Sequence, residues 1–372
     1  MPVQRPELAR RTSHRGERVP DAHLRAAVGP IEIPWTSNLS TTSDYPQPVR
    51  KAKTRARGTV EGVTDLAADA SPTTDTAPPA PVLVVIDRAR AGARGDGPGW
   101  HLADAAEPTV NVVDLGVTRG DGIFEAFGVV DGAVQALEPH LRRLARSAAL
   151  LDLPELDLDL IREAVLASAA AHAPVPFALT KLIVTRGLEG VPDSEPSAWA
   201  RTEVYEDHAA ERRDGIRVVS LDRGYRHDVM QTSPWLLQGA KTLSYAVNKS
   251  VLREAARRGA DDVLFVSSDG YALEGPSASL VARFGHRFVT PRTDQGILEG
   301  TTQAAVFDAL ADLGHETAYE LLPLTRVHEA DALWLLSSGR QIAPVSDLDG
   351  RSFGIDHELT TTLVEALWAR RT

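Results

Sequence analysis

Three short segments of the chain carry side chains that could act together on one charged organic group. Lys241 follows an apolar run, and burial lowers the pKa of a lysine, which leaves more of its amine neutral and nucleophilic. Glu274 comes next along the chain, and a carboxylate can pair with a protonated ring nitrogen. Thr301 and Thr302 then open a predicted helix after Gly300, and the free N–H groups of a helix N-terminus bind phosphate.

A lysine, a carboxylate and a phosphate site are what a pyridoxal phosphate (PLP) enzyme requires. The lysine forms a Schiff base with the cofactor's aldehyde, and the displaced amine can act as a general base. The carboxylate keeps the pyridine nitrogen protonated, so the ring accepts electrons. Each segment alone has an ordinary explanation, namely a solvated lysine, a turn carboxylate or a helix cap. Their combination predicts a PLP site formed by Lys241, Glu274, Thr301 and Thr302.

The same segments resemble the fold-type IV PLP enzymes, which are the class IV aminotransferases. Within that family the chain is most similar to the actinobacterial 4-amino-4-deoxychorismate lyases. The resemblance covers about residues 81–372. It rests on AKTLSYAVNKSVLREAARRGADDVLFVSSDGYALEGPSASLV (240–281), RGDGIFE (119–125) with HLRRL (140–144), and ILEGTT (297–302). It implies the two-domain α+β and α/β fold of the D-amino-acid aminotransferase-like enzymes.

The resemblance also implies which residues bind the cofactor phosphate. Arg143 of HLRRL takes that role in the family, and a guanidinium suits phosphate because its two N–H groups bind in parallel. Spacing alone does not separate Arg143 from its neighbour Arg142. Ser337 and Ser338, at the end of a predicted strand, are expected to border the same phosphate.

Three further residues are candidates for the rest of the site. Tyr245 lies on the helix that follows Lys241, where it could line the cofactor or serve packing. Arg119 and Phe124 belong to RGDGIFE, which faces the active site in the relatives. There Arg119 could bind a substrate carboxylate.

Departures from other family patterns favour one reaction. After TRG (185–187) the chain continues LEGVPD and lacks the Arg-x-His pair of D-amino-acid aminotransferases. KTLSYAVN (241–248) likewise departs from the Lys-x-Gly-Gly-Asn-Tyr-like sequence of branched-chain enzymes. The resemblance therefore implies a lyase that converts 4-amino-4-deoxychorismate to 4-aminobenzoate and pyruvate for folate biosynthesis. A branched-chain or D-amino-acid aminotransferase is the alternative, and an inactive PLP-binding homologue is a more distant one.

Composition limits the remaining classes. The 372 residues are 43% hydrophobic and carry a net charge of −11, which suggests about two domains and argues against nucleic-acid binding. The chain has no cysteine, which excludes disulfides and thiolate metal sites, and its histidines lack metal-binding spacing. No apolar run reaches the ~18–20 residues of a membrane span. We expect a cytoplasmic enzyme with a small-molecule substrate, and the resemblance implies a homodimer.

The chain divides into three parts by pattern. Residues 1–80 are rich in Arg, Pro, Ala and Thr and are expected to form a disordered extension. Residues 81–206 are predicted to form a small α+β domain, and residues 207–372 the large PLP-binding domain. Apolar periodicity predicts helices at 138–151, 157–172, 245–258, 302–313 and 356–370. Strands are expected at 177–187 and 215–224, with a hairpin that turns at Asp269-Gly270.

Overall fold

The computed structural model describes residues 77–93 and 95–370, which belong to one compact unit, Thr73–Thr372. The expected disordered extension lies outside the described residues, except for residues 77–80. None of the helices in the described ranges has the length and hydropathy of a membrane-spanning segment.

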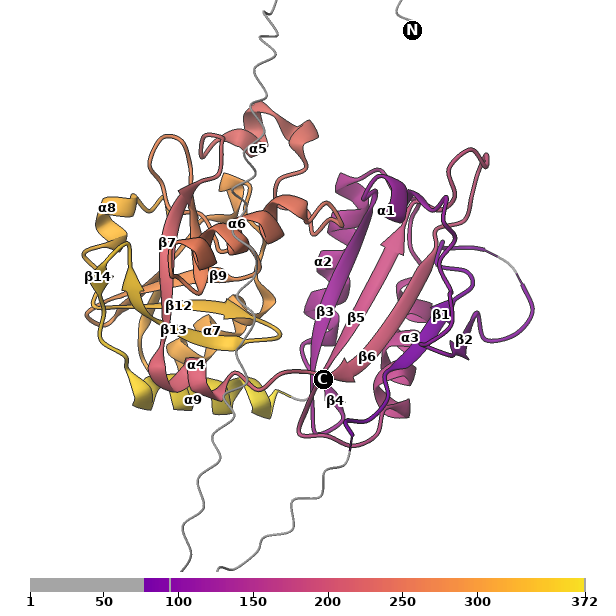
Figure 1. Cartoon of the computed structure of the whole chain (residues 1–372), viewed down its shortest axis with the longest axis horizontal. Helices are drawn as coiled ribbons and strands as arrows, with labels where there is room; N and C mark the ends of the chain where they lie inside the picture. Colours follow the sequence, from indigo (N-terminus) through magenta and orange to yellow (C-terminus); the bar gives the residue numbers. More distant parts are fainter. Residues whose placement is uncertain (1–76, 94, 371–372) are drawn as a thin grey trace, which may run out of the picture. The chain divides into compact units, whose positions relative to one another are not determined.

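The first half of the unit is an antiparallel sheet of six strands in the order β2-β1-β6-β5-β3-β4. Helices α2 and α3 cover one face of it (Figure 1). The strands are β1 Val82–Ile86, β2 Trp100–Ala103, β3 Gly122–Val130, β4 Ala133–Val134, β5 Phe177–Thr185 and β6 Ala198–Val204. The helices are α1 Leu115–Thr118, α2 Leu137–Leu150 and α3 Leu158–Ala171.

Alternation along β3 gives this sheet two different faces. Ile123 and Phe127 are fully buried in the core that α2 and α3 complete. Because successive side chains of a strand point to opposite faces, Phe124 and Ala126 face away from that core. The second face of the sheet is therefore free to form the wall of a cavity.

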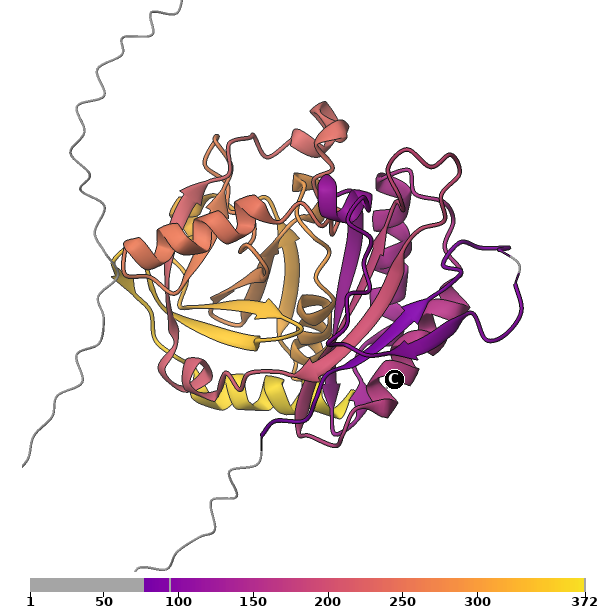
Figure 2. The same ribbon diagram turned by 45° about the vertical axis from the view of Figure 1, so that its right-hand side comes forward.

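The second half is an eight-stranded mixed sheet in the order β11-β10-β9-β12-β13-β7-β8, with β14 paired to β13. Helices α7 and α9 pack together beside it, and α6 packs against β7 and β8 (Figure 2). The strands are β7 Ile216–Asp222, β8 Asp262–Val266, β9 Ser279–Phe284, β10 Arg287–Pro291, β11 Glu316–Glu320, β12 Ala332–Ser337, β13 Gln341–Leu348 and β14 Arg351–Ser352. The helices are α4 Ala209–Asp214, α5 Val229–Thr232, α6 Ala246–Arg257, α7 Thr301–Asp312, α8 Leu324–Val327 and α9 His357–Ala369, with 3₁₀ turns η1 Pro234–Leu236 and η2 Thr293–Gln295.

The long helices lie close to their expected bounds, but the hairpin at Asp269-Gly270 is only partly formed. β8 pairs in parallel with β7 along its length. The returning segment bonds β8 in places, as where Phe265 N–H donates to Glu274 C=O at 2.8 Å, yet it forms no regular strand. The backbone of Glu274 thus stays paired with β8, while its side chain accepts a hydrogen bond from Leu298 N–H in the loop before α7.

Candidate active site

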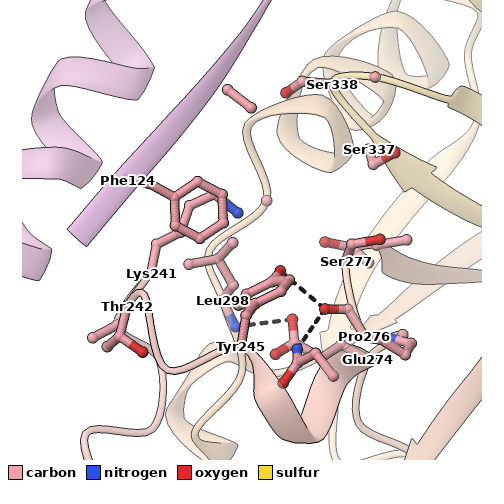
Figure 3. A pocket seen from close by; sticks show the side chains of 18 of the residues that line it. Phe124, Lys241, Thr242, Tyr245, Glu274, Pro276, Ser277, Leu298, Ser337 and Ser338 are labelled. Atoms are coloured by element: carbon pink, nitrogen blue, oxygen red, sulfur yellow. Dashed lines mark hydrogen bonds between the residues drawn. The ribbon is translucent and has the colours of Figure 1, made fainter. Parts of the chain in front are cut away.

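A cavity of about 660 Å³ lies between the free face of the first sheet and the second sheet. Its walls come from β3 and β5, the segment before and into α6, the loop after β8, the start of α7 and the β12–β13 turn. Figure 3 shows the side chains that point into it. It gathers most of the predicted site residues: Phe124, Arg143, Lys241, Tyr245, Glu274, Thr301, Thr302, Ser337 and Ser338.

The backbone around Lys241 is tied to the first sheet and to α2. Its N–H donates to Ser147 Oγ at 3.1 Å, and its carbonyl accepts from Phe124 N–H at 3.0 Å. The Lys241 side chain extends into the cavity, with Nζ 4.3 Å from the centre of the Phe124 ring. Burial, with help from the positive charge of Arg143, lowers the pKa of Lys241 to about 8. About a tenth of this amine is then neutral at pH 7, far more than for an exposed lysine.

Glu274 lies in the same cavity, with one carboxylate oxygen held by the chain. Its Oε2 accepts a hydrogen bond from Leu298 N–H at 3.1 Å, and within the described ranges no other donor contacts this carboxylate (Figure 3). Burial raises the pKa of Glu274 to about 7. The neighbouring Tyr245 hydroxyl donates to Pro276 C=O at 3.0 Å, and its ring packs edge-on against Phe124 at 5.2 Å. Glu274 can therefore accept one further hydrogen bond from a cationic N–H, which would also stabilise its ionised form.

The start of α7 forms a second polar end of the cavity. Its N-cap residue, Gly300, supplies no side-chain hydrogen bond, so the first N–H groups of the helix are not capped. A Cβ on Gly300 would lie 2.3 Å from Ser279 Oγ, so any larger residue here would force the Ser279 side chain to move. The hydroxyls of Thr301 and Ser338 lie beside the same helix start. Uncapped N–H groups next to hydroxyls suit a phosphate dianion.

A buried ionic cluster that sequence reasoning missed supports this phosphate-type site. Glu125 is fully buried and accepts from Arg143 Nε at 2.8 Å and Nη2 at 2.6 Å. His140 Nδ1 lies 2.7 Å from the same carboxylate, and His140 Nε2 lies 3.2 Å from Thr301 Oγ1. Burial alone would raise the pKa of Glu125, but the charges of Arg143 and His140 outweigh it and hold that pKa well below its usual range.

The cluster also shows which of the two adjacent arginines of α2 reaches the cavity. Arg143 is buried, lines the cavity and donates to Glu299 C=O at 2.8 Å, whereas Arg142 is exposed. The sequence did hold a signal for Glu125. It occupies a core-facing position of β3, where a carboxylate needs a cationic partner.

Arg119 does not line the cavity. Its guanidinium pairs with Glu189 at 2.9 Å and also donates to Thr118 C=O. Arg186, of TRG (185–187), pairs with Asp121 at 2.6 Å and donates a hydrogen bond to Leu151 C=O. Both arginines therefore form ion pairs outside the cavity.

The arrangement fits pyridoxal phosphate. Lys241 supplies an amine for the aldehyde, Glu274 an acceptor for the ring N–H, and the α7 start with Arg143 a site for the phosphate. No group of three or more acidic or histidine side chains in the described ranges is placed to bind a metal ion.

Comparison with known proteins agrees with this chemistry. A family model for amino-transferase class IV matches residues 122–348. A bifunctional aminodeoxychorismate lyase / D-amino acid transaminase from Mycobacterium tuberculosis is 42% identical over 259 residues, which cover 66% of this chain and 87% of the relative.

Two solved structures share the fold closely. A fold IV transaminase from Curtobacterium pusillum is 52% identical with a TM-score of 0.76, and the match covers 78% of this chain and 98% of that protein. A hypothetical aminotransferase from M. tuberculosis, in its PLP-bound form, is 37% identical with a TM-score of 0.70 and coverage of 78% and 99%. The expected fold is thereby confirmed, and the cofactor is pyridoxal phosphate.

Proposed function

We propose that this chain, which belongs to the class IV aminotransferase family of PLP enzymes, is a 4-amino-4-deoxychorismate lyase that forms 4-aminobenzoate and pyruvate. The observation that carries the proposal is the grouping of Lys241, Glu274 and the uncapped α7 start around one cavity. The bifunctional M. tuberculosis relative supports the lyase reaction. So does the segment after TRG (185–187), which lacks the Arg-x-His pair of D-amino-acid aminotransferases.

Each of these cavity residues has a separate role in the proposed reaction. When bound, PLP supplies the electron sink for the carbanion next to the substrate nitrogen. Lys241 would hold the cofactor, and its free amine would accept the proton from the amine-bearing carbon of the substrate. Glu274 would hold the proton on the ring nitrogen, and Arg143 with Thr301 would bind the phosphate. Loss of the substrate proton and cleavage of the ring C–O bond would make the ring aromatic, and the released enolpyruvate would take up a proton to become pyruvate.

Amino transfer to a 2-oxo acid is the second candidate function. The same M. tuberculosis relative is named for D-amino acid transamination as well as for the lyase reaction, and the C. pusillum protein is a transaminase. Transamination would use the same lysine and the same cofactor. An inactive homologue is disfavoured because Lys241 and Glu274 are both present and both line the cavity. By family resemblance we further propose that the enzyme is a cytoplasmic homodimer.

Direct assay separates these functions. Purified, PLP-loaded protein is incubated with 4-amino-4-deoxychorismate alone, and separately with branched-chain or D-amino acids plus 2-oxoglutarate. The lyase proposal predicts equal amounts of 4-aminobenzoate and pyruvate without any added 2-oxo acid. Glutamate formation without 4-aminobenzoate would replace it with the aminotransferase function, and no product in any assay would favour the inactive homologue.

Replacing Glu274 by glutamine should slow turnover and stabilise the PLP-free protein. The folded pKa of Glu274, about 7, lies above that of an unfolded glutamate, so stability is lost as pH rises from about 4.5 to 7. A glutamine does not ionise and so avoids this loss. The free energy of unfolding of Glu274→Gln should therefore exceed that of wild type by on the order of 2 kcal/mol at pH 8, and by little at pH 4.5. Urea unfolding of both PLP-free proteins at the two pH values checks this. An equal difference in the free energy of unfolding at both pH values would show that ionisation of Glu274 does not destabilise the folded protein.

A further inference from the structure

The lysines of the described residues all line one cavity. Residues 77–93 and 95–370 contain three lysines, Lys181, Lys241 and Lys249, and each of them is part of the cavity wall. The other permanently cationic side chains in these ranges are arginines, many of them in ion pairs with carboxylates. The cofactor accounts only for Lys241, while Lys181 and Lys249 are exposed residues at the wall of the cavity.

Lys181 and Lys249 enter the cavity from different elements. Lys181 is on β5 opposite Ala126 of β3, on the sheet face that carries Phe124. Its Nζ lies 5.2 Å from the centre of the Phe124 ring, the same ring that Lys241 Nζ contacts at 4.3 Å. Lys249 is on α6, one turn after Tyr245. Burial, followed by the positive charge of Lys249, lowers the pKa of Lys181.

Neither amine has a carboxylate partner in the part of the chain that the structure describes. Glu203 is near enough to Lys181 to raise its pKa, but it pairs with Arg201 at 2.6 Å. Two like charges that share a cavity repel each other, and an anion between them would relieve that repulsion. The phosphate has its own donors at Arg143 and the α7 start, so this anion is a different group.

We propose that Lys181 and Lys249 together bind the substrate carboxylate that is remote from the reacting amine, so that the enzyme selects dicarboxylate substrates. This inference rests on the proposed amine chemistry at Lys241, because the substrate must place its amine there and its second carboxylate beyond Phe124. The two lysines supply the cavity with a carboxylate-binding group, which Arg119, paired with Glu189, does not. 4-Amino-4-deoxychorismate carries two carboxylates and fits this requirement.

The test compares two anions of equal chain length that do not react. Binding of glutarate, a dicarboxylate, and pentanoate, a monocarboxylate, to the PLP-loaded protein is measured by calorimetry. Glutarate should bind at least about tenfold more tightly, which is the scale of one charge-assisted contact. Lys181→Met and Lys249→Met should each remove most of that preference, and the double variant should bind the two anions equally.

Matched variants separate a specific site from general charge. Arg253→Met removes a positive charge from the same helix, one turn after Lys249 and outside the cavity, and should leave the glutarate preference unchanged. Lys181→Arg and Lys249→Arg keep the charge and should keep the preference; they also show that the fold tolerates change at these positions. Equal binding of both anions by wild type, or an intact preference in the double variant, would overturn the proposal. Failure of the lyase function gives a different result: no 4-aminobenzoate, with the glutarate preference still present.

Discussion

A Lys241→Ala variant is expected to lose covalently held PLP and to turn over at least a thousandfold more slowly than wild type. The change removes both the attachment point of the cofactor and the base that takes the substrate proton. Each tenfold loss of rate corresponds to about 1.4 kcal/mol of barrier, so the expected loss is at least about 4 kcal/mol. Lys241 Nζ has no ion-pair partner within the described ranges, so its removal should not unfold the protein.

Steady-state rates and the visible absorbance of bound PLP check this expectation. Addition of a small primary amine such as ethylamine should restore part of the lost rate, because it replaces the missing base without restoring the covalent bond. Lys249→Ala is the natural control, since it removes another lysine of the same cavity but should retain covalent PLP. A Lys241→Ala protein with wild-type turnover would remove the basis of the proposed mechanism.

Replacing Glu125 by alanine is expected to lower the free energy of unfolding by about 3–5 kcal/mol, because it leaves the buried Arg143 guanidinium without its counter-ion. His140 loses its carboxylate contact in the same change, and through it the contact with Thr301 at the helix start is weakened. PLP should therefore bind less tightly as well. Urea unfolding of the PLP-free protein measures the first effect, and titration of PLP into it measures the second.

An exposed ion pair provides the comparison for Glu125. Glu195 pairs with Arg90 where both side chains are about 41% exposed, and Glu195→Ala should change stability by less than about 1 kcal/mol. If Glu125→Ala is no more destabilising than Glu195→Ala, then the buried cluster does not stabilise the fold as its geometry indicates.

Local pattern predicted the elements that carry the site but not the contacts between them. The apolar period around Leu141 and Leu144 placed α2 within one residue of its observed bounds, and the Gly-Thr-Thr sequence placed the start of α7. The hairpin after β8 was only partly correct: the returning segment bonds β8 at Phe265, but Ala272 N–H donates to Leu322 C=O and the segment forms no regular strand.

Contacts over long separations explain the remaining differences. Glu125, His140 and Thr301 come from three elements, and no periodicity signals that they meet. Arg119 was a candidate for a substrate carboxylate, but within the described residues it lies outside the cavity and pairs with Glu189. Both outcomes depend on tertiary packing, which propensity and spacing do not encode.

Borohydride reduction of the PLP-loaded protein, followed by peptide mass analysis, tests the central claim most directly. Reduction fixes PLP permanently to the lysine that holds it. The described cavity offers three lysines, so the method distinguishes among them at once. We expect one modified peptide, with the PLP mass on Lys241. PLP fixed on Lys181 or Lys249 instead, or no fixed PLP in an active protein, would contradict it.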